Sequence, residues 1–411
     1  MRKIMAALDI GNSNVKLVVA EMTKGKFNVL SVSETKTLGI KKNVIVSEAD
    51  LIEAVQSVIK DSETKLNMPI RKVLVVVPSQ DIEFTIGEAK INIDDGTVNG
   101  SDISRVILES YNGIIPDNME LVNVLPMHFK LDNNEVVNNP NTLVSSTLAV
   151  KSVIMMAPKS DVYKYLSVLD KLNIDIVDIG TDALGDYYVF KNEKIDKQVG
   201  VIINLGGSKT TVSIFNKGII TNSSVIELGS KNIDNDIAYI YRVNLDDANK
   251  LKENFAYAHP KYTSSSDEIV INDKDNNEVK INQQEISKIA YFRIKEILEN
   301  VKKEINHLTK KEISYIIVTG GTSESIDFKL IIDELFDKNA TIGKIKTLGV
   351  RHNKFSSVIG LIKWYNSIQQ LKMKDYSIFS IEEQEEFSGV HNEGLSDDSV
   401  IGKFFNYFLD N

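Results

Sequence analysis

The segment that decides the fold reads Asp9-Ile10-Gly11-Asn12-Ser13-Asn14, and a similar segment, Asn204-Leu205-Gly206-Gly207-Ser208-Lys209-Thr210, follows in the second half of the chain. Each segment lies between two short runs rich in β-branched and aliphatic residues. That pattern predicts a tight turn between two strands. Gly and Ser in both turns leave the backbone free to make a sharp reversal.

The strands around the two turns repeat as well. Three strands are predicted for each turn, at 4–10, 15–21 and 27–35 and again at 199–205, 210–215 and 219–226. Helical spacing of apolar residues adds helices after both groups. We infer an internal duplication of an α/β unit, with an α/β fold overall.

The two turns share a chemistry with a third, Thr319-Gly320-Gly321-Thr322-Ser323, which follows a predicted strand and precedes a helix. Exposed backbone N–H groups in such turns can bind phosphate oxygens. A carboxylate at the end of the preceding strand, as at Asp9, can hold a hydrated Mg²⁺ ion. Glycine in the third turn lets a nucleoside approach the backbone. No P-loop or G-x-G-x-x-G pattern occurs.

Composition narrows the class of protein. The chain has 411 residues, 48 Lys+Arg, 57 Asp+Glu and a net charge of -9. Its length predicts two or more domains, and its acidity argues against general nucleic-acid binding. The absence of cysteine excludes disulfides and thiolate metal sites, and the five scattered histidines show no ligand spacing. No apolar run reaches the roughly 20 residues of a membrane span, and Asp9 interrupts the N-terminal apolar stretch too early for a signal peptide. We expect a cytoplasmic protein.

The order of the turns and the duplication resemble the actin, sugar-kinase and heat-shock-chaperone ATPase superfamily. In detail the chain resembles the FtsA family of bacterial actin-like cell-division proteins. The resemblance covers almost the whole chain and is carried by Gly229–Ala238 (G-x-x-x-[VI]-T-x-D-I-A in the family), Ala248–Lys252 (A-E-x-[IL]-K), Arg293–Ile297 (R-x-x-E-[IL]), Val124–Phe129 with Asn139-Pro140 (V-I-P-x-x-Y and N-P), and Ser356–Ile362 (S-T-A-V-G-L-L).

The resemblance implies an actin-like fold of duplicated α/β domains around a nucleotide cleft, with a small α+β insertion and a second excursion of helices and a hairpin. The implied domains are 1A (1–78, 160–197 and 350–374), 1C (79–159), 2A (198–228 and 311–349) and 2B (229–310), followed by an acidic flexible linker (375–398) and an amphipathic helix (399–411).

The resemblance also implies a site for ATP or ADP with Mg²⁺, the metal being held through water by Asp9. The implied nucleotide-binding residues are Asp9, Gly11, Asn12, Ser13, Asn14, Asn204, Gly206, Gly207, Ser208, Lys209, Thr210, Asn249, Lys252, Gly320, Gly321, Thr322 and Ser323.

Five of these positions depart from the family pattern. Asn204 replaces an Asp and brings no negative charge to Mg²⁺, while Lys209 can partly neutralise phosphate. Asn249 replaces the Glu that contacts the ribose, and Ser208 and Thr322 replace glycines. We expect nucleotide binding with slow or absent hydrolysis, and no residue is confidently catalytic.

Partners are implied in the same way. The excursion after Gly229 would receive the C-terminal peptide of the tubulin homologue FtsZ, and Arg293 would face acidic residues of that peptide. A lone Arg on a helix is otherwise a solvated residue. Further copies of the chain would be partners in a filament, and no nucleic-acid partner is expected.

The last apolar cluster predicts a membrane anchor. Val400, Ile401, Phe404, Phe405 and Phe408 fall on one face of a helix, and Lys403 and Leu409 complete the set expected at an anionic membrane surface. Residues 375–411 hold nine acidic residues and one basic residue. Anionic lipid repels the acidic residues. One tail should therefore bind weakly and many tails on a filament should bind well. Docking of this helix on its own domain is the alternative.

The leading hypothesis is a peripheral protein of the inner membrane face at the division septum, which binds ATP, forms filaments and tethers FtsZ filaments. One alternative is an actin homologue of pilus assembly or cell shape. Another is a small-molecule kinase of the same fold, although Asn204 and Thr211 stand where such an enzyme needs carboxylates.

Overall fold

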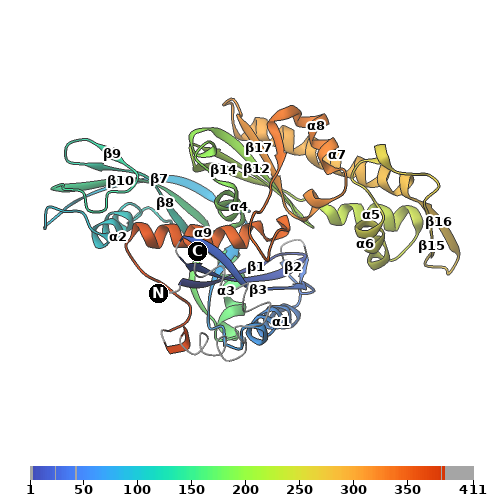
Figure 1. Ribbon diagram of the computed structural model, residues 1–411, viewed down its shortest axis with the longest axis horizontal. Coiled ribbons are helices and arrows are strands. Elements are labelled where there is room, and N and C mark those ends of the chain that lie inside the picture. Colours follow the sequence, from blue (N-terminus) through green and yellow to red (C-terminus); the bar gives the residue numbers. More distant parts are fainter. Residues whose placement is uncertain (1–2, 24, 42–43, 381, 385–411) are drawn as a thin grey trace, which may run out of the picture.

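Two five-stranded sheets with the same internal order form the centre of the molecule (Figure 1). The structure is a computed structural model that describes residues 3–23, 25–41, 44–380 and 382–384. The first sheet has the order β11 (Asp175–Thr181), β6 (Lys72–Val77), β1 (Lys3–Ile10), β2 (Asn14–Thr23), β3 (Lys26–Lys36). The second has the order β18 (Ala340–Ile342), β17 (Tyr315–Thr319), β12 (Val199–Leu205), β13 (Thr210–Asn216), β14 (Ile219–Ile226).

The pairing inside the two sheets is the same. β1 is antiparallel to β2 and parallel to β6, and β12 is antiparallel to β13 and parallel to β17. Asp9 lies opposite Lys16 in the first hairpin, and Asn204 lies opposite Thr211 in the second. The predicted duplication and the α/β actin-like fold are therefore confirmed.

Helices cover both sheets. α1 (Glu48–Leu66) begins after its N-cap Ser47, whose hydroxyl accepts a hydrogen bond from the Asp50 amide at 3.4 Å. Its apolar stripe packs with α3 (Lys159–Lys171) into the first core. α7 (Gln283–Leu308) and α8 (Phe328–Phe336) pack into the second core. We call the first sheet with its helices the first half, and the second sheet with its helices the second half.

Two helices cross where the halves meet. α4 (Asp182–Phe190) and α9 (Ser356–Leu371) touch through backbone, because both carry glycine at the crossing. A methyl group added at Gly360 would lie 1.6 Å from the Gly185 carbonyl oxygen, and one added at Gly185 would lie 2.1 Å from the Ser357 carbonyl oxygen. Only glycine allows so close an approach.

Two insertions extend in opposite directions along the long axis (Figure 1). One, which we call the arm, follows β6 and contains α2 (Gly100–Glu109) and a four-stranded antiparallel sheet in the order β7 (Glu83–Asn92), β10 (Thr147–Pro158), β8 (Met119–Leu131), β9 (Val136–Val137). The other follows β14 and contains α5 (Ser230–Tyr241), α6 (Leu245–Asn254), the hairpin β15 (Glu268–Asn272) and β16 (Glu278–Asn282), and the start of α7. The boundaries predicted for these units remain predictions.

Several short elements have too few residues to produce a periodic sequence signal. They are the hairpin β4 (Ile40–Lys41) and β5 (Val44–Ile45), the strands β9 and β18, and the 3-10 turns Ile195–Lys197, Pro260–Tyr262, Gly321–Glu324, Asp337–Asn339 and Asn353–Phe355. Among the described residues, no helix has the length and apolar character needed to cross a membrane.

The start of the predicted linker is packed against the first half, which corrects its boundary. Ile378 and Phe379 are buried in the first core, and the Ile378 amide donates to the Ile4 carbonyl at 2.8 Å. Gln384 is also buried and donates to the Phe379 carbonyl at 3.1 Å. The acidic composition concealed these apolar contacts, so any free linker starts after residue 384. The rest of the linker and the predicted helix 399–411 lie outside the described residues.

Gly360→Ala should lower the free energy of unfolding by about 3 kcal/mol, because its methyl group meets a backbone carbonyl that cannot move aside. Urea unfolding measures the change. The control is Gln370→Ala at an exposed position of the same helix, which should change stability by less than about 0.5 kcal/mol. A Gly360→Ala protein as stable as the parent would contradict the backbone contact.

Candidate functional site: three adjoining turns

The first two turns are built alike. In the first, the Gly11 amide donates to the Asn14 carbonyl at 3.1 Å. In the second, the Gly206 amide donates to the Lys209 carbonyl at 3.0 Å. The sequence similarity thus reflects one turn geometry at the same end of two equivalent sheets.

The three turns lie against one another. A methyl group added at Gly207 would lie 2.1 Å from Ser13 Oγ, so the first and second turns are in contact. Lys231, at the start of α5, donates its ammonium to the Asn12 carbonyl at 3.1 Å and its amide to the Gly207 carbonyl at 2.7 Å. Gly320 of the third turn, with φ of 89°, packs against the Asn204 side chain. The structure therefore brings all three predicted turns together.

Each turn presents one buried polar atom without a hydrogen-bond partner among the described residues. These atoms are Ser13 Oγ, Lys209 Nζ and Thr322 Oγ1. Burying an ammonium group without a partner is costly, and native proteins avoid it unless a ligand completes the site. One cation and two hydroxyls on neighbouring glycine-rich turns suit an anion with several oxygens, such as a phosphate chain.

Asp9 is paired with a lysine that sequence reasoning did not select. Lys16 Nζ lies 2.9 Å from Asp9 Oδ2, and both side chains are largely buried. Burial lowers the pKa of Lys16, but the carboxylates of Asp9 and Glu34 outweigh it and leave that pKa raised. Lys16 therefore stays charged beside the first turn. The register of the hairpin could have shown it, since Lys16 stands directly opposite Asp9.

A buried carboxylate stands behind Asn204. Asn204 Nδ2 donates to Asp186 Oδ2 at 2.7 Å, while the hydroxyls of Ser356 and Ser357 donate to Asp186 Oδ1 at 2.5 and 2.9 Å. Burial raises the pKa of Asp186 to about 7, although the hydrogen bond from Ser356 favours the ionised form. Position 204 thus lacks a carboxylate, but the carboxylate of Asp186 on α4 is hydrogen-bonded directly to the Asn204 side chain. No sequence signal marked Asp186, because its place depends on the α4–α9 crossing.

Known protein families match two regions of the chain. A family model described as "Cell division protein FtsA" matches residues 201–360, and one described as "SHS2 domain inserted in FTSA" matches residues 79–156. The two matches together cover more than half of the chain. The cell division protein FtsA of Bacillus subtilis (strain 168) is 27% identical over 370 residues, which cover 88% of this chain and 83% of that protein.

The chain belongs to the FtsA family. The family models match the arm, which carries Val124–Phe129, and the second half with its insertion, which carries Gly229–Ala238, Ala248–Lys252 and Arg293–Ile297.

Solved structures share the fold of this FtsA-family chain at low sequence identity. The type IV pilus biogenesis complex PilM–PilN aligns with a TM-score of 0.58 and 11% identity, over 87% of this chain and 97% of that chain. MreB5 of Spiroplasma citri bound to ADP aligns with a TM-score of 0.56 and 13% identity, over 90% and 98% of the two chains. These similarities show the fold alone.

Two residues that the FtsA resemblance placed at the nucleotide, Asn249 and Lys252, contact an acid of the chain. Lys252 Nζ lies 2.8 Å from Asp234 Oδ1, and Asn249 Nδ2 donates to Asp234 Oδ2 at 3.4 Å. Burial raises the pKa of Asp234, although Lys252 opposes the shift. Asp234 lies on α5, whose first residue Ser230 donates its amide to the Gly206 carbonyl at 3.0 Å. Asn249 and Lys252 are thus joined to the second turn through α5.

Arg293 forms ion pairs with two acidic residues of this chain. Its Nε and NH2 atoms donate to the two carboxylate oxygens of Asp236 at 2.7 and 2.8 Å, and NH1 donates to Glu296 at 2.5 Å. The hydrogen bond to Asp236 raises the pKa of Arg293. This bidentate pair ties α7 to α5, so an acidic peptide would have to compete with two carboxylates for this guanidinium.

Asn204→Asp should destabilise the FtsA-family chain by about 2–3 kcal/mol at pH 8, because it sets two carboxylates at the 2.7 Å separation of the present hydrogen bond. The loss should shrink at pH 6. The pKa of Asp186 already lies near 7 in the folded chain, above the value of about 3.9 of an unfolded Asp, so lowering the pH protonates the folded pair first.

The matched control is Asn204→Asp combined with Asp186→Asn, which exchanges the two groups and should restore most of the lost stability. Thermal unfolding at both pH values measures these differences. Equal stability of Asn204→Asp and the parent at pH 8 would contradict the contact.

Proposed function

We propose that this chain binds ATP in the three-turn cleft, self-assembles into filaments and tethers FtsZ filaments to the cytoplasmic membrane at the division septum through a C-terminal amphipathic helix. The observation that carries the nucleotide proposal is the set of three unpartnered buried atoms, Ser13 Oγ, Lys209 Nζ and Thr322 Oγ1, one from each turn. MreB5 of Spiroplasma citri, whose solved structure has a similar fold, is bound to ADP in that structure.

The residues of the cleft suit a nucleotide with Mg²⁺. Among the described residues no cluster of three or more His, Cys, Asp or Glu could hold a metal ion by itself. Mg²⁺ commonly takes one or two carboxylates with phosphate oxygens and water, and Asp9 would supply its carboxylate through water. The ion would contribute positive charge beside the phosphates.

Hydrolysis, if present, should be slow. The side chain of Asn204 is neutral and its amide is bound to Asp186. Asp186 is itself buried and already accepts hydrogen bonds from three side chains, which disfavours a role for it in activating a water. The site therefore suits ATP binding, and a conformation of the protein that depends on the bound nucleotide, more than rapid hydrolysis of ATP.

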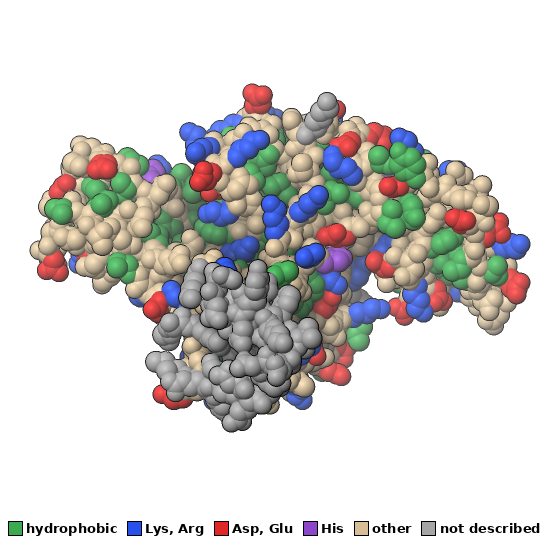
Figure 2. Space-filling view, in the orientation of Figure 1, with side chains coloured by type: hydrophobic (Ala, Val, Ile, Leu, Met, Phe, Trp, Pro, Cys, Tyr) green, Lys and Arg blue, Asp and Glu red, His purple; other side chains and the backbone are tan. Residues whose placement is uncertain are grey.

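Partner binding is proposed at the insertion that holds α5, α6 and α7. Apolar side chains gather on this end of the molecule, at the right of Figure 2. The exposed large apolar residues there include Tyr239, Ile240, Leu245 and Phe292. They flank the Arg293–Asp236 pair on α5 and α7 and suit a short peptide with apolar and acidic residues. Binding of an FtsZ C-terminal peptide separates this proposal from a role in pilus assembly or cell shape.

Lys209→Met should weaken ATP binding about tenfold or more, because it removes the buried cation that faces the cleft. Isothermal titration calorimetry with Mg²⁺ and ATP measures the affinity. Lys303→Met, which removes an exposed lysine on α7, is the control and should bind ATP as the parent does. Unchanged affinity in Lys209→Met would contradict the proposed site.

Membrane attachment should depend on self-assembly, because each tail binds weakly and a filament presents many. A variant selected by electron microscopy for loss of filaments should lose most of its sedimentation with anionic liposomes. Deletion of residues 399–411 should abolish sedimentation in the parent as well. Undiminished liposome binding by the filament-deficient variant would refute this dependence.

A further inference from the structure

One carboxylate on α4 binds residues from two other parts of the molecule. Asp182 is the first residue of α4. Its Oδ1 atom accepts hydrogen bonds from the Ser79 amide, at 3.0 Å, and from the Ser79 hydroxyl. Its Oδ2 atom accepts a hydrogen bond from the Thr211 hydroxyl at 3.0 Å. Both partner residues are buried, so these contacts are shielded from water.

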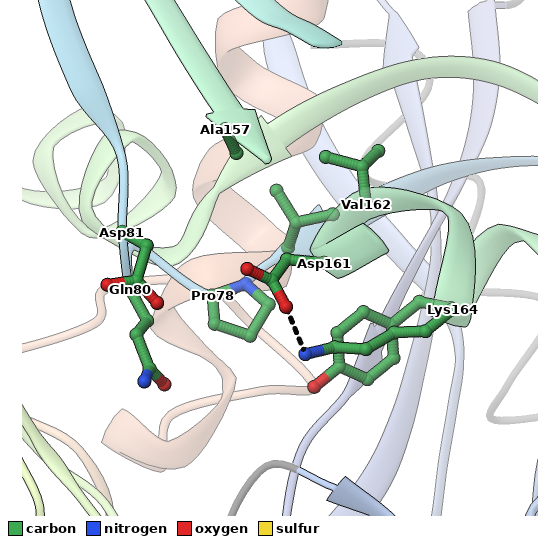
Figure 3. A pocket seen from close by; sticks show the side chains of 9 residues that line it. Pro78, Gln80, Asp81, Ala157, Asp161, Val162 and Lys164 are labelled. Atoms are coloured by element: carbon green, nitrogen blue, oxygen red, sulfur yellow. Dashed lines mark hydrogen bonds and ion pairs between the residues drawn. The ribbon is translucent and has the colours of Figure 1, made fainter. Parts of the chain in front are cut away.

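Ser79 lies at the root of the arm, where the chain leaves β6 for β7. Two residues later Asp81 adopts a left-handed backbone with φ of 55°. A cavity of about 40 Å³ lies beside this root, and Figure 3 shows Gln80 and Asp81 on one side of it and Asp161 and Lys164 of α3 on the other. The root of the arm thus borders a small pocket shared with α3, while Ser79 itself is buried.

A second contact connects the arm to the same end of α4. Asn123, on β8 of the arm, donates its side-chain amide to the Ile179 carbonyl at 2.8 Å. Ile179 is two residues before Thr181, the N-cap of α4. The arm is thus held to the first half beside the N-terminus of α4 at two points.

Thr211 lies at the edge of the cleft. It stands opposite Asn204 in the β12–β13 register, directly after the turn that carries Lys209. Asn204 itself is bound by Asp186, one helical turn after Asp182 on α4. α4 therefore holds the second turn at two points and the root of the arm at one.

We propose that Asp182 couples the arm to the nucleotide cleft, so that a movement of the second turn changes the angle of the arm. Asp182 Oδ1 binds Ser79 of the arm root and Asp182 Oδ2 binds Thr211 beside the second turn. A displacement of either residue therefore displaces the other through the N-terminus of α4. The part of this proposal that concerns ATP rests on the proposed nucleotide function. The contact through Asp182 between the arm and the residue after the second turn is present without any ligand. Coupling of this kind is reciprocal, so the arm must also influence nucleotide affinity.

The absence of cysteine allows a direct measurement, because introduced cysteines become the sole labelling sites. Spin labels at Val144→Cys, which is 81% exposed on the arm, and at Lys303→Cys on α7 report the distance between the arm and the second half. Thr211→Val removes one hydroxyl at the cleft and Ser79→Ala removes one at the arm root. Ser213→Ala, which removes a buried hydroxyl of β13 that contacts Ser223 instead, is the matched control.

Without nucleotide, Thr211→Val should shift or broaden the label distance, while Ser213→Ala leaves it as in the parent. With Mg²⁺ and ATP, Ser79→Ala should change ATP affinity by about fivefold or more, the lower end of ordinary couplings, although Ser79 lies outside the cleft. An unchanged distance in Thr211→Val overturns the proposal. So does an unchanged ATP affinity in a Ser79→Ala protein whose parent binds ATP.

Failure of the proposed function looks different from failure of the coupling. If the parent binds no ATP, the nucleotide proposal falls. The coupling is then decided by the label distance of Thr211→Val in the absence of ligand, and Asp182→Asn provides a second variant of nearly the same shape that should reproduce the shift.

Discussion

The backbone contact between α4 and α9 is the constraint on which the rest of the structure depends. Gly185 and Gly360 let the two helices cross with a separation that any side chain would increase. The N-terminal turns of both helices then reach the cleft together. There Ser356 and Ser357 of α9 and Asn204 of β12 converge on Asp186 of α4. The junction that joins the two halves is therefore also the support of the second turn.

This arrangement explains why an amide at position 204 is compatible with the fold. The place behind Asn204 is already taken by a carboxylate, and burial raises the pKa of Asp186 to about 7. A second carboxylate at 2.7 Å would force one of the two to take up a proton. The second turn thus has its acidic group behind it, at Asp186, and carries one unpartnered buried cation, Lys209 Nζ, among the described residues. Such a distribution favours holding an anionic ligand over activating a water against it.

The sequence predicted the parts of this account that depend on local pattern. Strand patterns and the repeated turns predicted the three antiparallel strands of each sheet, and helical spacing predicted helices after them. The site turns were found because glycine-rich turns carry a chemical signal of their own. Asp186, Asp182 and Lys16 were missed because their roles depend on which helices and strands meet. The buried contacts of Ile378 and Phe379 were missed because acidic neighbours outweighed them in composition.

The central claim is that the three turns enclose one phosphate-bearing ligand. A crystal structure of the chain grown with Mg²⁺ and a non-hydrolysable ATP analogue tests it most directly. The account predicts phosphate oxygens within hydrogen-bond distance of Ser13 Oγ, Lys209 Nζ and the amides of the first two turns, with the nucleoside beside Gly320 and Thr322. A nucleotide bound elsewhere, or a cleft in which Ser13 still contacts Gly207 without ligand at saturating nucleotide, would contradict it.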